Sequence, residues 1–456
     1  MRSSKSIFFI FLLLFTTTLS GSVLAQRTLS VQSPDPRLKI AFDLMERHNY
    51  QAAMAEFQSF SQETGASADL AMTARYYAAH CALKLYHPDA EEQLLAFNQR
   101  NPGSVYESRV WFDLANYYFR IKKWETAVQY YTRIPADGLE EESQIEADFK
   151  TGVSCFQLQQ FDRAKSYFQK LRRKDHPYKG SAAYYTAYLN FKDGLLDDAL
   201  ADLDVAKTSP EYKSSIPVLK ASILYKKKEY KEVIDLGEET FKDTARIANP
   251  EELHLLVGES YFNQKEYTKA AGHFETYSKG VRGNLPRGLQ FRVAFTYFKT
   301  DQTDKAIAGF RQVAARLDTT KGKQDSLGQY GSYYLGICYL KKDQKQFAYN
   351  AFDLASEMKA DPHIQEVAWF NAGKLAYDLE KYSDAVDILK DFVDNYPKSS
   401  HVVEANELIG EGLLNSNDFE AALAYMENAR VKTDRLSLAY QRAAYQRGTT
   451  LFNDGN

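Results

Sequence analysis

Histidine, the side chain most often used in acid–base and metal chemistry, occurs eight times in 456 residues without any recognised grouping. No pair has the spacing of an HExxH helix, and none is paired with cysteine as in a zinc site. Glycine-rich phosphate loops, GxSxG turns and strand–helix alternation are missing from the sequence as well. We therefore predict a protein that is not an enzyme and holds no metal or cofactor. The eight are His48, His80, His87, His176, His254, His273, His363 and His401.

Adjacent acidic side chains are the second candidate for chemistry, because two carboxylates can share general acid–base work. Glu140 to Glu142 and the pair Asp197–Asp198 both lie where a helix is expected to begin. Negative charge at that end of a helix is stabilised by the helix dipole and remains solvated. A structural role is therefore the simpler prediction for both.

Composition excludes several other classes of protein. Lys and Arg total 57 against 60 Asp and Glu, a formal charge of −3, so no basic excess exists to neutralise a nucleic-acid backbone. Aromatic residues make up 14%, which is too hydrophobic for a disordered chain. Only 23 glycines and 12 prolines occur, which favours helices over a turn-rich β protein. A chain of this length is also too long for one compact core.

One small residue recurs through the chain at a nearly constant spacing. We call this position the marker; it is Gly or Ala, at intervals of 34 to 42 residues and most often 37. Such a period indicates paired helices stacked into a solenoid. The markers are Ala41, Ala78, Ala115, Gly152, Ala187, Ala221, Gly258, Ala294, Gly336, Gly373, Gly410 and Gly448.

Two further positions keep a fixed distance from the marker and belong to the expected second helix of each pair. A small residue follows by twelve: Ala53, Ala90, Ala127, Ala164, Ala199, Val233, Ala270, Ala306, Ala348, Ala385 and Ala422. A large apolar residue follows by sixteen: Phe57, Leu94, Tyr131, Phe168, Leu203, Phe274, Phe310, Phe352, Leu389 and Met426. In the sixth repeat Gly237 takes the place of the large residue. We therefore expect its second helix to be the least well packed.

The clearest copy of the pattern runs from Trp369 to Pro397, with Ala372-Gly373, Tyr377 and Ala385 between them, and residues 111–134 repeat it. It resembles the tetratricopeptide repeat, in which a Trp, Leu-Gly, an aromatic, an Ala, another aromatic and a Pro follow one another. The resemblance implies an all-α fold. It would be a right-handed α-solenoid of about eleven and a half helix-turn-helix repeats over residues 37–456, with the last repeat incomplete.

The first 25 residues have the features of a cleaved signal peptide. Arg2 and Lys5 precede an apolar run over 7–15, and small residues lead up to Ala25. The run is shorter than the roughly 20 residues that span a bilayer. We expect cleavage after Ala25, a linker over 26–36, and export to the periplasm. Too few and odd in number for a disulfide framework, the cysteines are expected to be buried thiols: Cys81, Cys155 and Cys338.

Aromatic residues recur on the expected first helices, three before and four after the marker. In tetratricopeptide-repeat proteins the first helices line a concave groove that binds partners. The rings either fill contacts between neighbouring helices, which their regular recurrence favours, or form a ladder for an extended peptide or an amphipathic helix. The candidate groove residues are Phe112, Asn116, Phe119, Lys150, Tyr184, Tyr185, Tyr188, Phe191, Phe291, Phe295 and Phe298. Asn116 and Lys150 match a fragment of the clamp with which some members of the family hold a C-terminal carboxylate; the rest of that pattern is missing, so we do not predict the clamp.

Two places depart from the regular period. The longest interval contains the polar segment Asp318–Gly328, for which an exposed loop is the simpler prediction and a loop over the groove the alternative. The twelfth marker, Gly448, is followed by only eight residues, so its second helix is missing before Asn456. Either the last first helix acts as a lone cap or the polypeptide continues. Apolar Leu451 and Phe452 favour continuation.

These observations together predict a non-enzymatic periplasmic scaffold that binds envelope proteins or peptides in its groove, does not bind nucleic acid and does not span the membrane. The junctions at 101–106 and 396–400 resemble those of periplasmic tetratricopeptide-repeat proteins that work in outer-membrane assembly and the Tol–Pal system. The alternative is the sensing or docking half of a larger signalling or catalytic protein whose effector domain lies beyond Asn456. Glycan binding by the aromatic ladder is a third hypothesis.

Overall fold

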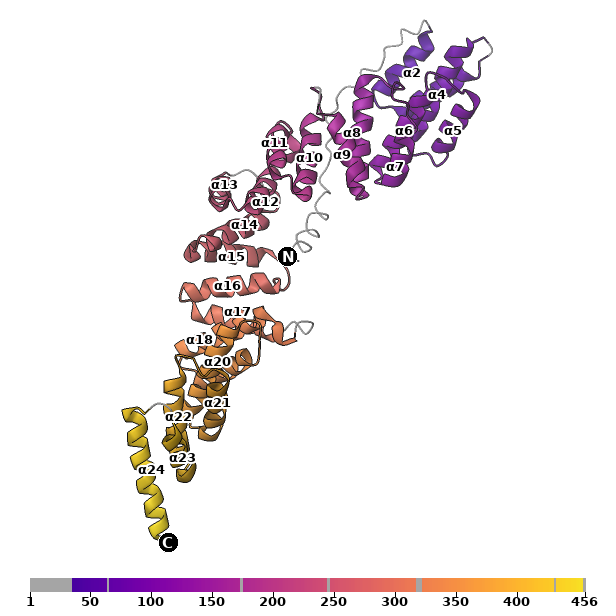
Figure 1. Cartoon of the computed structure of the whole chain (residues 1–456). Helices are drawn as coiled ribbons and strands as arrows, with labels where there is room; N and C mark the ends of the chain where they lie inside the picture. Colours follow the sequence, from indigo (N-terminus) through magenta and orange to yellow (C-terminus); the bar gives the residue numbers. More distant parts are fainter. Residues whose placement is uncertain are drawn as a thin grey trace. The chain divides into compact units, whose positions relative to one another are not determined.

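The computed structural model describes residues 35–63, 65–172, 175–243, 247–316, 322–429 and 432–453. Within these ranges it contains 23 α-helices, α2 to α24, and two short 3-10 helices, with no strand (Figure 1). The all-α prediction is confirmed. The predicted signal peptide and most of the predicted linker lie outside the described residues. Helix α2 begins at Pro36, the last residue of that linker.

The helices alternate between first and second members of a pair. First helices are α2 (Pro36–Glu46), α4 (Ala68–Lys84), α6 (Glu107–Arg120), α8 (Glu141–Gln157), α10 (Lys179–Asp193), α12 (Ile216–Lys227), α14 (Pro250–Asn263), α16 (Arg287–Lys299), α18 (Ser326–Lys341), α20 (Pro362–Asp378), α22 (Val402–Asn415) and α24 (Asp434–Asn453). Second helices are α3 (Tyr50–Ser61), α5 (Ala90–Arg100), α7 (Trp124–Tyr131), α9 (Phe161–Lys170), α11 (Leu196–Ala206), α13 (Tyr230–Lys242), α15 (Tyr267–Gly280), α17 (Thr303–Ala315), α19 (Lys345–Ser356), α21 (Tyr382–Asn395) and α23 (Phe419–Asn428). Each marker lies on a first helix, which confirms the predicted eleven pairs followed by one further helix.

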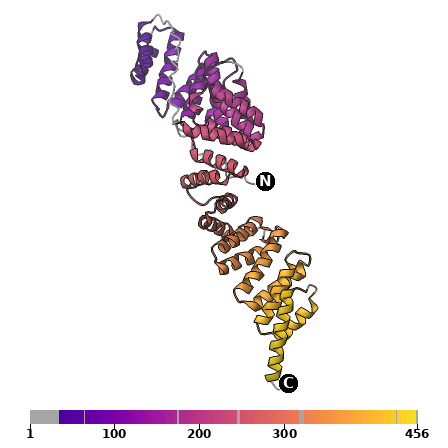
Figure 2. The ribbon, with the colours of Figure 1, turned by 90° about the vertical axis from the view of Figure 1, so that its left-hand side faces the viewer.

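The chain forms two compact units, the first ending at Leu189 and the second beginning at Asn190, both within α10. Inside each unit, successive helices pack against their neighbours in the chain, and α14 to α17 are seen as stacked layers in Figures 1 and 2. This is solenoid packing, in which a repeat contacts mainly the repeats beside it.

The marker position is small because the second helix of the same repeat lies directly against it. A Cβ atom added at Gly336 would lie 2.8 Å from the Phe352 ring, and one at Gly152 would lie 2.7 Å from Phe168. Real Cβ atoms do not approach other heavy atoms so closely, so the large ring sixteen residues on requires a small partner. Both rings are buried, at 1% and 0% exposure. The recurring pair of positions is therefore the contact that joins the two helices of a repeat.

A backbone feature that the sequence did not predict recurs in the turn inside each repeat. In each of the eleven turns one residue has a positive φ near 60° or above. It lies seven residues after the marker in ten of the turns and eight after it in the other. Only the fifth repeat uses glycine there, so ten polar or aromatic side chains accept a conformation that costs L-residues energy. The residues are His48, Tyr86, Lys122, Gln159, Gly194, Lys228, Lys265, Asp301, Asp343, Glu380 and Asn417. The helix pairing on both sides fixes this conformation, which is why no single residue type marks it.

The gap expected at Gly237 is filled from the next repeat. A Cβ atom on Gly237 would lie 2.2 Å from Cγ2 of Val257, which projects from α14 into the space that a large side chain takes elsewhere. Val233 and Ile234 of the same helix are buried. The sequence pattern within one repeat cannot reveal this exchange, because the filling residue belongs to the following repeat.

The polar segment predicted as a loop over Asp318–Gly328 ends earlier than expected. Residues 317–321 lie outside the described ranges, a 3-10 helix spans Gly322–Gln324, and α18 begins at Ser326. Asp325 caps α18, accepting a hydrogen bond from the Gly328 backbone N–H, and is only 2% exposed. Residues 326–328 are therefore helical and not loop, whereas Gly322, Gln324 and Ser326 are exposed as predicted.

Candidate functional site

Three of the predicted groove residues lie in the hydrophobic core. Phe112 is 9% exposed and Tyr184 and Tyr185 are each 3% exposed. The Phe112 ring meets Tyr131 at 6.5 Å, and Tyr185 stacks on Phe168 at 5.0 Å with the ring planes 8° apart. A partner could reach these rings only after the packing of the repeat had opened.

Asn116, Phe119 and Lys150 lie close together, but the polar groups of Asn116 and Lys150 already have partners in the chain. The Lys150 ammonium donates to Asn116 Oδ1 at 2.7 Å and to the Glu146 carboxylate. Tyr131 donates to the same Asn116 oxygen at 2.7 Å. The ammonium also lies 5.4 Å from the Phe119 ring centre. Glu146 and Asn116 therefore already provide the acceptors for Lys150 that the carboxylate of a ligand would otherwise provide.

Tyr188 and Phe191 are half-buried at the end of α10. The Tyr188 ring lies 5.4 Å from Phe156 in an edge-to-face contact. The Phe191 ring has the Lys226 ammonium 4.9 Å from its centre, and that ammonium donates to the Phe191 carbonyl at 3.0 Å. Both rings therefore help to join α10 to its neighbours within their own unit.

The predicted residues of repeat eight form an aromatic cluster with one residue of the next repeat, which we call the repeat-eight cluster: Phe291, Phe295, Phe298 and Tyr334. All four are half-buried and pack against the core of the second unit. Phe295 lies 6.1 Å from Phe291 and from Phe298, and Tyr334 of the next first helix lies 5.1 Å and 5.3 Å from Phe295 and Phe298. Sequence reasoning missed Tyr334, although its place two before the marker repeats that of Tyr185.

Two lysine ammonium groups border the repeat-eight cluster. Lys299 lies 5.3 Å from the centre of Phe295 and 5.8 Å from that of Phe298, and Lys341 lies 4.8 Å from Phe298. Lys341 also pairs with Asp301 at 2.9 Å. Cations held over aromatic faces add favourable electrostatic energy at a partly exposed surface. The cluster therefore combines apolar rings with positive charge, which suits an apolar side chain flanked by acidic ones.

A buried polar group that the sequence analysis did not single out joins α4 to α6. Asp113 accepts hydrogen bonds of 2.7 Å from Tyr76 and from Nδ1 of His80. Burial opposes ionisation of this carboxyl, but His80 and Tyr76 outweigh it and lower the pKa of Asp113. Since every partner is internal, the group stabilises the first unit. His80 and Asp113 are 33 residues apart, nearly one period, which is the signal that could have identified them.

The cysteines are buried free thiols, as predicted. Burial raises the pKa of Cys81 to about 12 and that of Cys338 to about 11. A thiol becomes a nucleophile or a metal ligand only as the thiolate, which these surroundings disfavour. Within the described residues, no group of three or more His, Cys, Asp or Glu is placed to hold a metal ion.

Two histidines form the least usual polar contact in the structure. Nδ1 of His254 on α14 lies 2.9 Å from Nδ1 of His273 on α15, and His273 Nε2 lies 3.3 Å from a Glu238 oxygen on α13. Because the Glu238 carboxylate can only accept a hydrogen bond, we assign a proton to His273 Nε2. In a neutral His273, Nδ1 then has no proton and accepts a hydrogen bond from Nδ1 of His254. Phe241 stacks on His254 at 4.0 Å, and Tyr261 donates to Glu238 at 3.0 Å. Protonating both rings would direct two N–H groups at each other.

This pair predicts that the second unit loses stability as the pH falls. Burial lowers the pKa of both histidines, and for His273 it outweighs the opposing effect of Glu238. The unfolded chain therefore binds more protons below about pH 6.5. The contribution of the two histidines to the free energy of unfolding is complete above that pH. It declines as the pH falls toward their lowered pKa in the folded state. We expect a lower urea midpoint at pH 5.5 than at pH 7.5.

His254→Phe, which keeps a ring against Phe241, should remove about half of that decline. His87→Phe is the matched control, since His87 contributes to no such pair and its replacement should leave the decline unchanged. Circular dichroism in urea at the two pH values measures both. An equal decline in all three proteins would contradict the assignment to His254 and His273.

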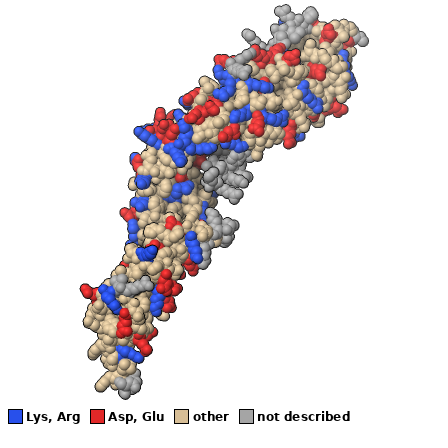
Figure 3. Space-filling view, in the orientation of Figure 1, with Lys and Arg blue, Asp and Glu red and all other residues tan. Residues whose placement is uncertain are grey.

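The surface offers no strongly charged face in the view of Figure 3, where Lys and Arg alternate with Asp and Glu over most of the helices. This distribution agrees with the small formal charge of −3. Among the helices that the structure describes, none combines the length and the apolar character needed to cross a membrane.

Comparison with known protein families finds matches in two segments of the chain. Two family models described as tetratricopeptide repeat match residues 150–213 and 367–399. No curated protein sequence matches the chain. Similar solved structures include the APC/C hetero-tetramer Cut9–Hcn1, with a TM-score of 0.27 and 15% identity over 90% of this chain and 91% of that chain. Another is a putative kinesin light chain from Podosopora anserina with nearly identical TPR-like repeats, with a TM-score of 0.30 and 14% identity over 45% of this chain and 99% of that one.

At such TM-scores these two structures add nothing to the assignment, which rests on the matched residues and on the helix pairs themselves. Both matched segments contain a marker and the residues twelve and sixteen after it: Gly152 with Ala164 and Phe168, and Gly373 with Ala385 and Leu389. Repeats of this kind generally serve as protein-binding scaffolds and not as enzymes. Residues 150–213 and 367–399 thus match tetratricopeptide repeats, and the helix pairs elsewhere in the described residues follow the same small-residue spacing.

Proposed function

We propose that this protein is a non-enzymatic scaffold of the periplasm that binds envelope proteins or peptides at the repeat-eight cluster. The observation that carries the proposal is the set of half-buried rings around Phe298 with the ammonium groups of Lys299 and Lys341 beside them. Aromatic side chains are enriched at the buried centre of protein interfaces. The lysines select a partner segment with acidic residues beside its apolar anchor.

The periplasmic part of the proposal is supported by the N-terminal sequence. Arg2 and Lys5, the apolar run over 7–15 and the small residues before Ala25 form the pattern of an export signal. N-terminal sequencing of the mature protein from the producing cells tests this part. A first residue of Gln26 in the periplasmic fraction supports it, whereas an intact Met1 in the cytoplasm would refute it.

The binding part is tested by pull-downs from periplasmic extract. Wild type is compared with two test variants, Phe298→Ala and Lys341→Glu, and with the control Lys305→Glu. Lys305 is the matched control, because it lies on the second helix of the same repeat and outside the cluster. Its ammonium is also next to an aromatic ring, 5.1 Å from the centre of Tyr297. Loss of a central aromatic anchor or reversal of a neighbouring charge should weaken the partner at least about tenfold. Lys305→Glu should leave recovery unchanged.

Circular dichroism confirms that each variant keeps its helices, and titration of the recovered partner gives the affinities. If every recovered protein binds wild type, Phe298→Ala and Lys341→Glu equally, the repeat-eight cluster is not the binding surface. If Lys305→Glu weakens binding as much as Lys341→Glu, charge on the repeat as a whole, and not the cluster, is responsible.

A further inference from the structure

The last described helix, α24, buries one face and leaves the opposite face open. Leu436, Ala439 and Ala443 are 3%, 3% and 0% exposed and belong to the core formed with α22 and α23. At 100° per residue, the other side of the helix carries five residues within an arc of about 80°. They are Leu438, Gln441, Tyr445, Gly448 and Phe452, which we call the open stripe. Its three large apolar members are 59%, 73% and 82% exposed.

The open stripe has the same register as the faces that receive second helices elsewhere in the chain. Gly448 is a marker, Tyr445 lies three before it, and Phe452 lies four after it. In repeat four, the residue three before the marker, Phe149, lies 6.1 Å from Phe168, and the residue four after, Phe156, lies 5.7 Å from Phe161. Phe168 and Phe161 both belong to the second helix, α9. Tyr445 and Phe452 correspond to Phe149 and Phe156. Unlike them, they have no second-helix partner among the described residues.

Glycine at the marker gives the sharpest comparison. A Cβ atom at Gly152, Gly336 or Gly373 would lie 2.6 to 2.8 Å from the large residue sixteen positions later. At Gly448 nothing lies within 4 Å of that Cβ position. The helix therefore presents the small residue of a helix pair with an empty place opposite it.

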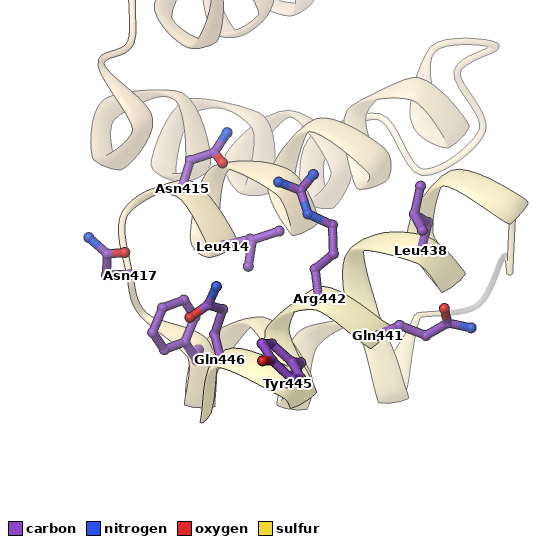
Figure 4. A pocket seen from close by; sticks show the side chains of 9 residues that line it. Leu414, Asn415, Asn417, Leu438, Gln441, Arg442, Tyr445 and Gln446 are labelled. Atoms are coloured by element: carbon purple, nitrogen blue, oxygen red, sulfur yellow. The ribbon is translucent and has the colours of Figure 1, made fainter. Parts of the chain in front are cut away.

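A recess beside the open stripe extends the surface that an added helix would cover. It has a volume of about 460 Å³ and lies between Leu414 and Phe419 on one side and Arg442 and Tyr445 on the other. Figure 4 shows Leu414, Arg442 and Tyr445 around one opening, with Asn415 above it. Exposed apolar surface next to a recess is typical of protein interaction sites.

Charge on α24 decides between possible occupants. From Leu436 to Asn453 the helix contains no Asp or Glu, and its charged residues are Arg442 and Arg447. Arg447 pairs with Glu420 at 2.9 Å, whereas Arg442 has no ion pair within the described residues. Two copies of α24 packed face to face would bring like charges together, which disfavours a second copy of this chain. An acidic helix complements the same surface.

We propose that the open stripe of α24 binds an acidic amphipathic helix of a partner protein, which packs on α24 as second helices pack on the other first helices. The occupant presents a small residue and, four positions later, a large apolar residue, the spacing found at Ala306 and Phe310. The large residue packs opposite Gly448. Carboxylates in the turn after that large residue lie near Arg442. This surface is separate from the repeat-eight cluster, so substitutions at one do not affect the other.

The chain itself contains a suitable probe. Helix α11 carries Ala199 and Leu203 at the required spacing, and the segment 195–208 has four Asp and one Lys. We expect a labelled synthetic peptide of residues 195–208 to bind the purified chain saturably by fluorescence anisotropy. A peptide in which Leu203 is replaced by Lys and a peptide with all four Asp replaced by Lys should each bind at least about tenfold more weakly.

Substitutions on α24 locate the site. Tyr445→Ser with Phe452→Ser should weaken peptide binding at least about tenfold, and Gly448→Phe should do the same by occupying the empty place. Since all three positions are exposed, the helix content should not change. Phe347→Ser with Tyr86→Ser is the matched control, because these aromatic residues are 57% and 52% exposed elsewhere and should not affect binding.

Three outcomes would overturn the proposal. One is absence of saturable binding, and another is equal binding by the α24 variants and the control. The third is self-association, detected by sedimentation and abolished by Tyr445→Ser with Phe452→Ser, which would make a second copy the occupant. Phe298→Ala, tested against the same peptide, should bind normally, so failure here is distinguishable from failure at the repeat-eight cluster.

Discussion

Phe352→Ala is expected to lower the free energy of unfolding of the second unit by about 3–5 kcal/mol. Phe352 is 1% exposed, and its ring is the large residue opposite Gly336, with Tyr333 at 5.8 Å on its other side. Truncation removes the buried ring and leaves a cavity that the neighbouring helices cannot close, because Gly336 offers no side chain to fill it. Urea denaturation followed by circular dichroism measures the loss.

Phe347→Ala on the same helix is the matched control for that measurement. The side chain is of the same type, and Phe347 is 57% exposed, with one ring contact to Tyr339 at 5.3 Å. We expect a loss of about 0.5 kcal/mol or less, the usual range for surface substitutions. Similar losses for Phe347→Ala and Phe352→Ala would mean that the position sixteen after the marker does not hold the repeat together.

The helix pairing could be predicted because it depends on residues that stay in register within one repeat. A small marker and a large residue sixteen later are both needed for one close contact, so the period appears directly in the sequence. Gly373 with Leu389 and Gly152 with Phe168 show the same contact in the two units, and it also fixes where each second helix lies. Ten of the eleven pairs carry both residues of that contact, whereas in the sixth Gly237 takes the place of the large residue.

Features that depend on neighbouring repeats could not be read in the same way. Val257 fills the place opposite Gly237 from the next repeat, and the pattern of either repeat alone does not contain that information. The positive φ of Lys122 or Asp343 is imposed by the helices on both sides and not by the residue type. Asp325 looked like part of a polar loop because its partner Arg287 lies 38 residues earlier.

The candidate site was predicted in part, for a related reason. The sequence does not show whether an aromatic residue on a first helix packs in the core or is available for binding. Only its burial in the structure distinguishes Tyr184 from Phe298. Tyr184 is 3% exposed, whereas Phe298 lies between first helices and remains half-buried. The open stripe of α24 could be inferred only once the contact at each marker was known, since Tyr445 and Phe452 match the residues that are covered elsewhere.

Arg287→Met should lower the free energy of unfolding of the second unit by about 3–5 kcal/mol, the usual loss when one partner of a buried ion pair is removed. The guanidinium donates to Asp325 Oδ1 at 2.8 Å and to the Val313 carbonyl at 3.0 Å, and it forms an ion pair with Asp325 Oδ2 at 2.7 Å. The Arg287 and Asp325 side chains are 16% and 2% exposed. Without Arg287, Asp325 keeps a buried charge at the start of α18. The urea midpoint measures the loss.

A second substitution tests whether the stranded charge is the cause. Asparagine at 325 still accepts from the Gly328 N–H and caps α18 but carries no charge, so Arg287→Met with Asp325→Asn should be more stable than Arg287→Met alone. Arg37→Met, at an exposed pair with Glu63, should leave the midpoint nearly unchanged. If the double variant is no more stable than Arg287→Met, lost packing of the arginine stem, and not an unpaired carboxylate, explains the loss.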